Sequence, residues 1–431
     1  MSTSCKSTPR ALVLGTEHPR SAAVVRSLAR EGIAVDVADH YRPPTALWRA
    51  SRYIRDRHML SEDSEDTLAE LLEIGCSVGG VLVPTNDHYL ILCSRNHLAL
   101  STVFKLSVPP WDVLEPLMDK VKASKIALEA GLEAPHQFQP RNEAELDNEL
   151  AKLDFSERAY VLKIRLWDSG AADAKTLRRV ALGGGDTATL RARCVDIRAR
   201  TGEFPVVEEV VPGGADRCIG VSMVVANDHQ PVLAYCVRRL KLQLYSTGAF
   251  KHPYELGANA YCESVVDPEA VELATRFVRQ ARYIGPVTVE LKRHPIDGRL
   301  KFIKADCRVV RATRLSTALG LDIPTALYDV ASGRNAQSTY PADYKAGVNW
   351  LWIEAYAYSL WKNRRGISLI RELWALALRL PKVRAWAYFD LRDPAPCILL
   401  ALTAWRRVKL LENPNARLAT QPGRTERAVS G

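Results

Sequence analysis

Short apolar runs alternate with helical stretches through the N-terminal quarter of the chain. The helical stretches repeat apolar residues every three or four positions, whereas the runs between them are short and continuous. Strand and helix patterns follow one another at 11–15, 21–32, 33–37, 68–74 and 80–84. Strands that alternate with helices pair in parallel, because each crossover returns the chain to the same edge of the sheet. We therefore predict a parallel α/β domain over residues 1–108.

A dinucleotide site is the first function to consider for a domain that opens in this way. The turn after the first strand reads GTEHPRSAA. It lacks the second and third glycines that let a backbone approach a pyrophosphate. The sequence therefore argues against a dinucleotide fingerprint, and Asp39 at the end of the second strand is read as a turn residue rather than a ribose ligand.

The pattern changes after Pro109 and Pro110. A helix with a glycine turn is followed by strands, a hairpin and a second helix, at 114–138, 160–164, 204–211, 218–241, 268–282, 287–293 and 300–306. The hairpin, and the PIDG turn between the last two strands, favour antiparallel pairing. We predict an α+β domain with antiparallel sheets over residues 109–333.

The last part of the chain is rich in tryptophan and in basic residues. Its patterns predict a helical C-terminal extension over 334–412 and a polar, disordered tail over 413–431. The helices interleave basic and apolar residues, as an interfacial membrane helix or a helix packed on a neighbouring domain would. We favour packing and keep a weak membrane-surface contact as the alternative. The apolar run 395–405 is about half of the roughly 20 residues that cross a bilayer, so no transmembrane segment is predicted.

Composition narrows the class of protein. A hydrophobic share of 47% and a charged share of 25% match an ordinary globular protein. The nine cysteines are scattered without a CxxC pair, which indicates a reducing compartment rather than a disulfide framework or a zinc knuckle. The start, MSTSCKSTPR, lacks the apolar core of a signal peptide. We predict a cytoplasmic protein.

The net charge of +10 raises the question of polyanionic partners. Nucleic acid, an anionic membrane surface and phosphorylated ligands are the candidates. The sequence carries no helix-turn-helix, zinc-finger or RNP-type signature, so we expect no sequence-specific nucleic-acid binding. A basic surface on a soluble enzyme is the favoured interpretation, and a polyanion binder is the weaker one.

The second domain carries residues suited to a nucleoside triphosphate. Lys163 lies inside an apolar strand, where an ammonium needs an anion, and Lys120 lies at the start of a helix. The glycines of Gly183–Asp186 favour a flap that closes over phosphates. An extended strand edge at Glu208–Val211 suits adenine, and carboxylates further on suit magnesium.

These segments resemble the ATP-grasp superfamily, in particular its carboxylate-amine ligase branch related to the large subunit of carbamoyl phosphate synthetase. The resemblance covers nearly the whole chain and rests on the order of LVPTNDHYL, LMDKVKASKIALEAGLEAPHQF, YVLKI, VVEEVVPGG, VELKRHPIDGRLKFIKADCR and AYFDLRDPAPCILL. It implies a pre-ATP-grasp domain, a two-lobed ATP-grasp domain, and the cofactors ATP and Mg²⁺. It also implies small-molecule carboxylate and amine substrates, joined through an acyl phosphate. A homo-oligomer is kept open as an assembly of the chain.

The resemblance also implies roles for individual residues. The nucleotide would be held by two phosphate-contacting lysines, an adenine hinge and a ribose ligand, namely Lys120, Lys163, Glu208, Glu209, Val210, Val211 and Asp216. Arg239 would face the acceptor and the transferred phosphate, although an exposed strand cation is an equally good interpretation. Arg308 would stabilise the transferred charge, and Glu290 would be the first magnesium ligand.

One departure from the family pattern concerns the metal. The last strand usually reads Glu-x-Asn-Pro-Arg, but here Lys304 takes the position of the bridging glutamate and Asp306 that of the asparagine. Two like charges about 4 Å apart repel by roughly 4 kcal/mol at an effective dielectric near 20, so Lys304 weakens a two-ion site. Glu290 and Asp306 remain to hold one ion. Lys304 could instead contact phosphate itself.

Two functions therefore stay open. The first is an ATP-dependent ligase. The second is an ATP-binding protein without turnover, with a sensor or assembly role, which is motivated by Lys304 and by Arg311 in place of a usual glycine. His88 and His252 are weaker catalytic candidates. Helix capping explains Asn86 and Asp87 beside His88, and His252 is more simply a loop histidine without a catalytic role.

Overall fold

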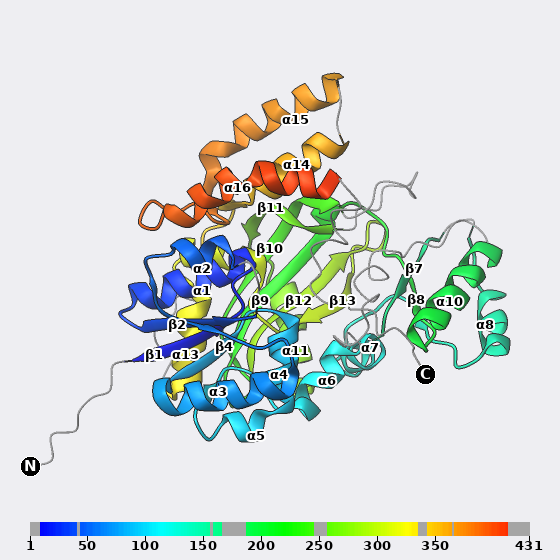
Figure 1. The fold of residues 1–431 in the computed structure, drawn as a ribbon. Coiled ribbons are helices and arrows are strands. Elements are labelled where there is room, and N and C mark those ends of the chain that lie inside the picture. The colour runs from blue at the N-terminus through cyan, green and yellow to red at the C-terminus, as the bar shows by residue number, and fades with distance from the viewer. Residues whose placement is uncertain are drawn as a thin grey trace, which may run out of the picture.

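The computed structural model describes residues 9–40, 44–155, 158–165, 187–244, 257–334, 343–363 and 366–412. Three β-sheets and the helices around them make up this part of the chain (Figure 1). The flap predicted at Gly183–Asp186, the loop residue His252 and the tail 413–431 lie outside the described residues.

The N-terminal sheet is parallel, as predicted. Its five strands have the order β3-β2-β1-β4-β5, with β1 at Arg10–Leu14, β2 at Ala34–Asp39, β3 at Ile54–Met59, β4 at Val81–Pro84 and β5 at Lys105–Leu106. Helix α1 (Pro19–Arg30) packs on one face through Ala11 and Val13, and α3 (Ser64–Val78) and α4 (Asp87–Arg95) pack on the other. The sequence did not predict β3, because its residues IRDRHM are mostly exposed and charged.

The central sheet has seven strands in the order β13-β12-β9-β10-β11-β14-β15. Its antiparallel part comprises β9 (Cys218–Val225), β10 (Pro231–Leu244), β11 (Gly257–Val265), β12 (Gly285–Arg293) and β13 (Leu300–Asp306). Helix α11 (Pro268–Gln280) buries Phe277 against this sheet, where its ring stacks on that of Phe302. The predicted hairpin and the predicted pair of strands around the PIDG turn are both confirmed.

A smaller three-stranded sheet forms a separate lobe. Strands β6 (Gln137–Phe138), β8 (Val206–Glu209) and β7 (Tyr160–Lys163) pair antiparallel in that order. Helices α8 (Glu143–Leu150) and α10 (Thr187–Thr201) lie beside it at the right of Figure 1 and share its apolar core. Helices α6 (Trp111–Met118) and α7 (Lys120–Glu129) connect this lobe to the parallel domain. The two sheets give the predicted two-lobed α+β layout.

The C-terminal extension is helical, with two strands added. Helices α14 (Ile353–Asn363), α15 (Gly366–Arg379) and α16 (Ala395–Glu412) lie above the central sheet (Figure 1). The chain also adds β14 (Asn349–Leu351) and β15 (Val383–Trp386) to the edge of that sheet. No helix among the described residues is long and apolar enough to cross a membrane. The predicted domain boundaries and tail remain predictions.

Packing of the C-terminal tryptophans is mixed. Trp350 is fully buried in β14, whereas the side chains on the outer face of α15 are exposed, with Trp374 at 68%. The favoured interpretation, packing on the ATP-binding domain, therefore describes one of these residues and not the other. The membrane-surface contact stays a prediction.

An ion-pair clamp ties the C-terminal extension to α1. Arg26 is buried and donates from Nε to Asp393 Oδ2 at 2.9 Å, from Nη1 to Tyr388 O at 2.7 Å, and from Nη2 to Asp393 O at 3.0 Å. Arg30 donates to Asp390 Oδ2 at 2.6 Å. The AYFDLRDPAP segment thus holds the C-terminal extension against α1.

Candidate functional site

Lys163 lies at the end of β7 and meets the hinge strand. Its Nζ is 2.5 Å from Glu208 Oε1, and the antiparallel register of β7 and β8 sets this contact. The Lys163 side chain is 22% exposed and that of Glu208 is 7% exposed. The anion that the sequence required for this lysine is therefore Glu208, a residue predicted only as part of the adenine hinge.

Lys120 begins α7 beside the same strand. Its backbone N–H donates to Arg165 O at 3.1 Å, two residues beyond Lys163. Asp119 caps the helix by accepting from Val121 N at 2.9 Å and also accepts from Arg165 Nε at 2.7 Å. The positive charge of Lys120 helps to lower the pKa of Asp306 on β13. The start of α7 therefore lies beside the end of β7, and Lys120 lies near Asp306 on β13. The contact of Lys120 and Lys163 with phosphate stays a prediction.

The hinge residues follow β8. The Glu209 and Val210 amides donate to His136 O at 2.8 Å and Ala159 O at 2.7 Å, which fixes the strand between its neighbours. The Val211 carbonyl accepts from Lys292 Nζ at 2.7 Å. The sequence predicted a free strand edge here, but β8 lies between β6 and β7, so the backbone of Glu208 and Glu209 is paired on both sides. The contact of Glu208–Val211 with adenine remains a prediction.

Sequence reasoning missed Lys292, which holds the chain after the hinge. Its Nζ bonds Val211 O and, at 2.8 Å, Gly213 O. Burial lowers the pKa of Lys292. Glu290 and Lys292 lie two positions apart on β12, so the alternation of that strand could have placed them on one face. Asp216, the predicted ribose ligand, is exposed in a short 3₁₀ turn near Lys292.

The two predicted metal ligands, Glu290 and Asp306, are already paired with cations. Arg239 on β10 reaches across β9 to form an ion pair with Glu290 on β12. Lys304 Nζ is 2.7 Å from Asp306 Oδ2 and 3.5 Å from Glu290 Oε1. Burial alone would raise the pKa of Asp306, but the charges of Lys304 and Arg308 hold that pKa well below its usual range. Asp306 is therefore ionised.

Magnesium does not fit these carboxylates as they stand. The ion needs several oxygen ligands in near-octahedral order, and in the described residues no group of three or more His, Cys, Asp or Glu side chains could hold a metal. Glu290 and Asp306 carry two negative charges, which Arg239 and Lys304 balance. A metal site there requires these pairs to open, so the metal role of Glu290 and Asp306 stays a prediction.

Arg308 joins β13 to the N-terminal domain. Its Nε is 2.6 Å from Asp87 Oδ1, at the start of α4. Asn86 caps the same helix by accepting from Tyr89 N at 2.9 Å, as the alternative interpretation held. Asp39 accepts from Thr16 N at 2.7 Å, so it is an internal strand-end residue. Arg308 thus lies where the parallel domain and the central sheet meet.

Two other cations near Arg239 are engaged away from the acidic pair. Arg238 pairs with Glu263 on β11, and Lys241 Nζ is 2.7 Å from Glu372 Oε1 on α15. Because side chains alternate along a strand, Arg238 and Arg239 leave opposite faces. Arg239 is therefore the arginine of this strand that faces the acidic pair.

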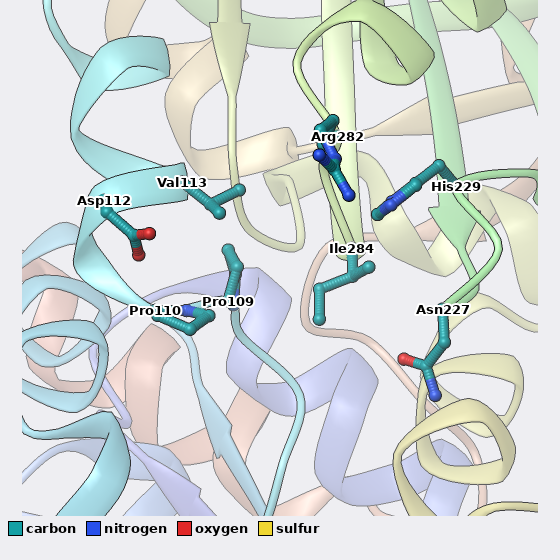
Figure 2. Close-up of a pocket in the computed structure, with 8 residues that line it drawn as sticks. All are labelled: Pro109, Pro110, Asp112, Val113, Asn227, His229, Arg282 and Ile284. Carbon is teal, nitrogen blue, oxygen red and sulfur yellow. The ribbon is translucent and has the colours of Figure 1, made fainter.

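A separate hollow lies between the start of α6 and the β9–β10 turn. It has a cavity volume of about 380 Å³ and is lined by Pro109, Pro110, Asp112, Val113, Asn227, His229, Arg282 and Ile284 (Figure 2). None of the predicted site residues is among them. His229 and Arg282 have positive φ angles of 62° and 49°, which a hairpin turn and a helix end explain.

Known structures share this architecture at low sequence identity. The biotin carboxylase domain of 2-oxoglutarate carboxylase from Hydrogenobacter thermophilus, solved with MgADP, ADP and bicarbonate, matches with a TM-score of 0.58 and 13% identity, over 80% of this chain and 74% of that one. N5-carboxyaminoimidazole synthetase from Staphylococcus aureus matches with a TM-score of 0.57 and 11% identity, over 79% and 80%. The L-amino acid ligase from Bacillus licheniformis matches with a TM-score of 0.54 and 14% identity, over 78% of both chains.

The chain has the ATP-grasp fold. The resemblance read from the motifs is therefore confirmed for the fold, and so is the predicted fold class. No protein-family model matches the sequence. A search of curated proteins finds no match.

Proposed function

We propose that the protein is an ATP-dependent ligase of the carboxylate-amine type that uses the cleft between the two lobes of its ATP-grasp fold. The observation that supports this most is the position of Lys120, which begins α7 beside the strand of Lys163 and whose charge acts on Asp306 of β13. The phosphates of ATP carry negative charge, which this pair of lysines would neutralise. The hinge at Glu208–Val211 would receive the adenine.

The reaction needs no protein nucleophile. A carboxylate oxygen of the first substrate attacks the γ-phosphorus of ATP, the bond to the β–γ bridging oxygen breaks, and ADP leaves. The amine then attacks the acyl carbon, phosphate leaves, and the amine loses a proton to solvent. Arg308 and Arg239 would stabilise the transferred phosphoryl group through their fixed positive charge. We place no metal on Glu290 and Asp306 in this scheme, because both are paired with cations.

A double variant tests nucleotide binding. Lys163→Met is combined with Glu208→Gln, so that no buried carboxylate is left without its cation. Loss of charge-assisted hydrogen bonds worth about 1.5–3 kcal/mol should weaken ATP binding by roughly 10–100-fold in calorimetry. The matched control is Lys152→Met with Glu149→Gln, an exposed pair 2.6 Å apart in the same lobe. Equal affinity in both double variants would remove Lys163 from the nucleotide site.

Turnover is tested separately. The purified chain, incubated with ATP, magnesium and pools of carboxylates and amines, should release ADP and phosphate only when both substrate classes are present. The alternative, an ATP-binding protein without turnover, is favoured by the pairing of Glu290 and Asp306 with cations. It predicts ATP binding of equal affinity with and without magnesium, and no ADP from any pool.

A further inference from the structure

In the described part of the chain, the buried guanidinium of Arg20 has no ion-pair partner. It lies in the first turn of α1, just after the carboxyl end of β1, and is 4% exposed. Its Nε has no hydrogen-bond partner, and no ion pair joins Arg20 to any residue in the described ranges. A guanidinium stays protonated in proteins, so burial without an anion is costly.

The charges around Arg20 increase this cost. The positive charges of Arg308 and Arg311 act on the Arg20 guanidinium more strongly than the negative charges of Asp87 and Glu17. Asp87 lies 2.6 Å from Arg308, and Glu17 lies 3.0 Å from His18. Both carboxylates therefore have a partner other than Arg20. We call Arg20, Arg308 and Arg311 the arginine cluster.

The backbone around the cluster also favours an anion. Helix α1 begins with Pro19 after His18, whose side chain makes no capping hydrogen bond. The first-turn amides of a helix and its dipole attract negative charge. Gly15, with φ of 84°, lets the turn after β1 approach the turn after β4, because a Cβ there would lie 2.9 Å from Asn86 Nδ2. The carboxyl ends of two parallel strands thus meet beside Arg20.

We propose that the arginine cluster binds an oxyanion, a carboxylate or phosphate group, carried by the acceptor substrate. The substrate class rests on the proposed ligase function, whereas the anion site itself does not. Arg308 lies two residues beyond Asp306, so the cluster adjoins the acidic end of the cleft on the side of the N-terminal domain. An acceptor anchored there by its anionic end would extend its reactive group toward the transferred phosphate. Arg20 is the residue that would select a charged acceptor over a neutral one.

Calorimetry on the full chain tests this. Inorganic phosphate and succinate are titrated separately, with the ATP site filled by a saturating non-hydrolysable ATP analogue and ionic strength held with sodium chloride. We expect the wild type to bind at least one of the two probes with a stoichiometry of one. Phosphate alone would indicate a phosphorylated acceptor, and succinate alone a carboxylate. Arg20→Gln should weaken that binding at least tenfold, while the exposed Arg49→Gln leaves it unchanged.

Thermal unfolding provides the second measurement. Because Arg20 lacks a protein anion, Arg20→Gln should unfold at the same temperature as the wild type or higher when no probe is present. A lower midpoint, equal probe affinity in Arg20→Gln and wild type, or no binding of either probe would each overturn the anion site. If the ATP analogue fails to bind but probe binding depends on Arg20, the ligase function fails and the anion site stands. If the analogue binds and neither probe does, the anion site fails alone.

Discussion

Helix α1 buries two arginines whose surroundings differ in one respect. Arg26 donates three hydrogen bonds to Asp393 and Tyr388, which hold the C-terminal segment against the helix. Arg20, on the same helix, has Arg308 and Arg311 as neighbours instead. The side chain and the burial are the same, and only the supply of anions differs. The described part of the protein supplies an anion to Arg26 and none that pairs with Arg20.

The two predicted metal ligands, Glu290 and Asp306, show how the protein treats the opposite charge. Glu290 and Asp306 are half-buried carboxylates that the chain neutralises with Arg239 and Lys304. The negative charges of Glu290 and Asp306 are therefore balanced by cations of the protein itself. In the described part of the chain, the positive charge of Arg20 is not balanced by a paired anion. A charge that the fold balances stabilises the fold. A charge that the fold leaves unbalanced marks the place where a ligand of opposite sign would bind.

The largest expected effect distinguishes the two arginines by stability. Arg26→Gln leaves the buried Asp393 without its cation, so the free energy of unfolding should fall by about 3–5 kcal/mol. Arg20→Gln should not lower it. Chemical denaturation of both variants measures this difference directly. A comparable loss in both would mean that Arg20, like Arg26, is structural.

The pH dependence of stability is the next largest effect. Burial lowers the pKa of His18 to about 4, although the hydrogen bond that His18 donates to Glu17 raises it, and Arg20 and Arg311 lower it further. The folded pKa lies below the unfolded value of 6.5, so His18 binds a proton more readily in the unfolded chain. Its contribution to stability is complete above pH 6.5 and is lost as the pH falls toward 4.

This loss amounts to about 3 kcal/mol, at 1.36 kcal/mol for each unit of pKa difference. Denaturation between pH 7 and pH 4 should show it as a slope that His18→Gln removes. Phosphate bound at the arginine cluster would favour the imidazolium, so phosphate should flatten the wild-type slope but not that of Arg20→Gln. A slope that survives in His18→Gln would belong to other groups.

The sequence predicted the elements and their order better than their contacts. Period-two and period-3.6 patterns placed the hairpin of β9 and β10 and helix α11 within a few residues. Lys163 pairs with Glu208 of the predicted hinge, and Lys120 begins its helix beside Arg165, two residues beyond Lys163. Local sequence patterns are enough to predict these helices and strands, because each one is defined by its own residues and turns.

The ionic partners could not be predicted in this way. Arg26 and Asp393 are 367 positions apart, and the contact exists only because the C-terminal segment returns to α1. Lys304 was expected to repel cations from a metal site, yet its immediate role is to pair with Asp306 on its own strand. Arg239 reaches Glu290 across an intervening strand. Strand order and register decide these pairs, and a single sequence does not contain either.

The smallest expected effect concerns the balanced carboxylates. Lys304→Glu removes the cation of Asp306 and places a third carboxylate beside Glu290. Magnesium should then strengthen ATP binding by about tenfold more than in the wild type, since oxygen ligands attract the ion and like charges no longer oppose it. Calorimetry with and without magnesium measures the ratio. Lys301→Glu is the control, because it reverses the same charge on the same strand but faces Glu133 outside the cleft. An unchanged ratio in Lys304→Glu would show that Lys304 is not what excludes a metal, and that Arg239 alone keeps Glu290 balanced.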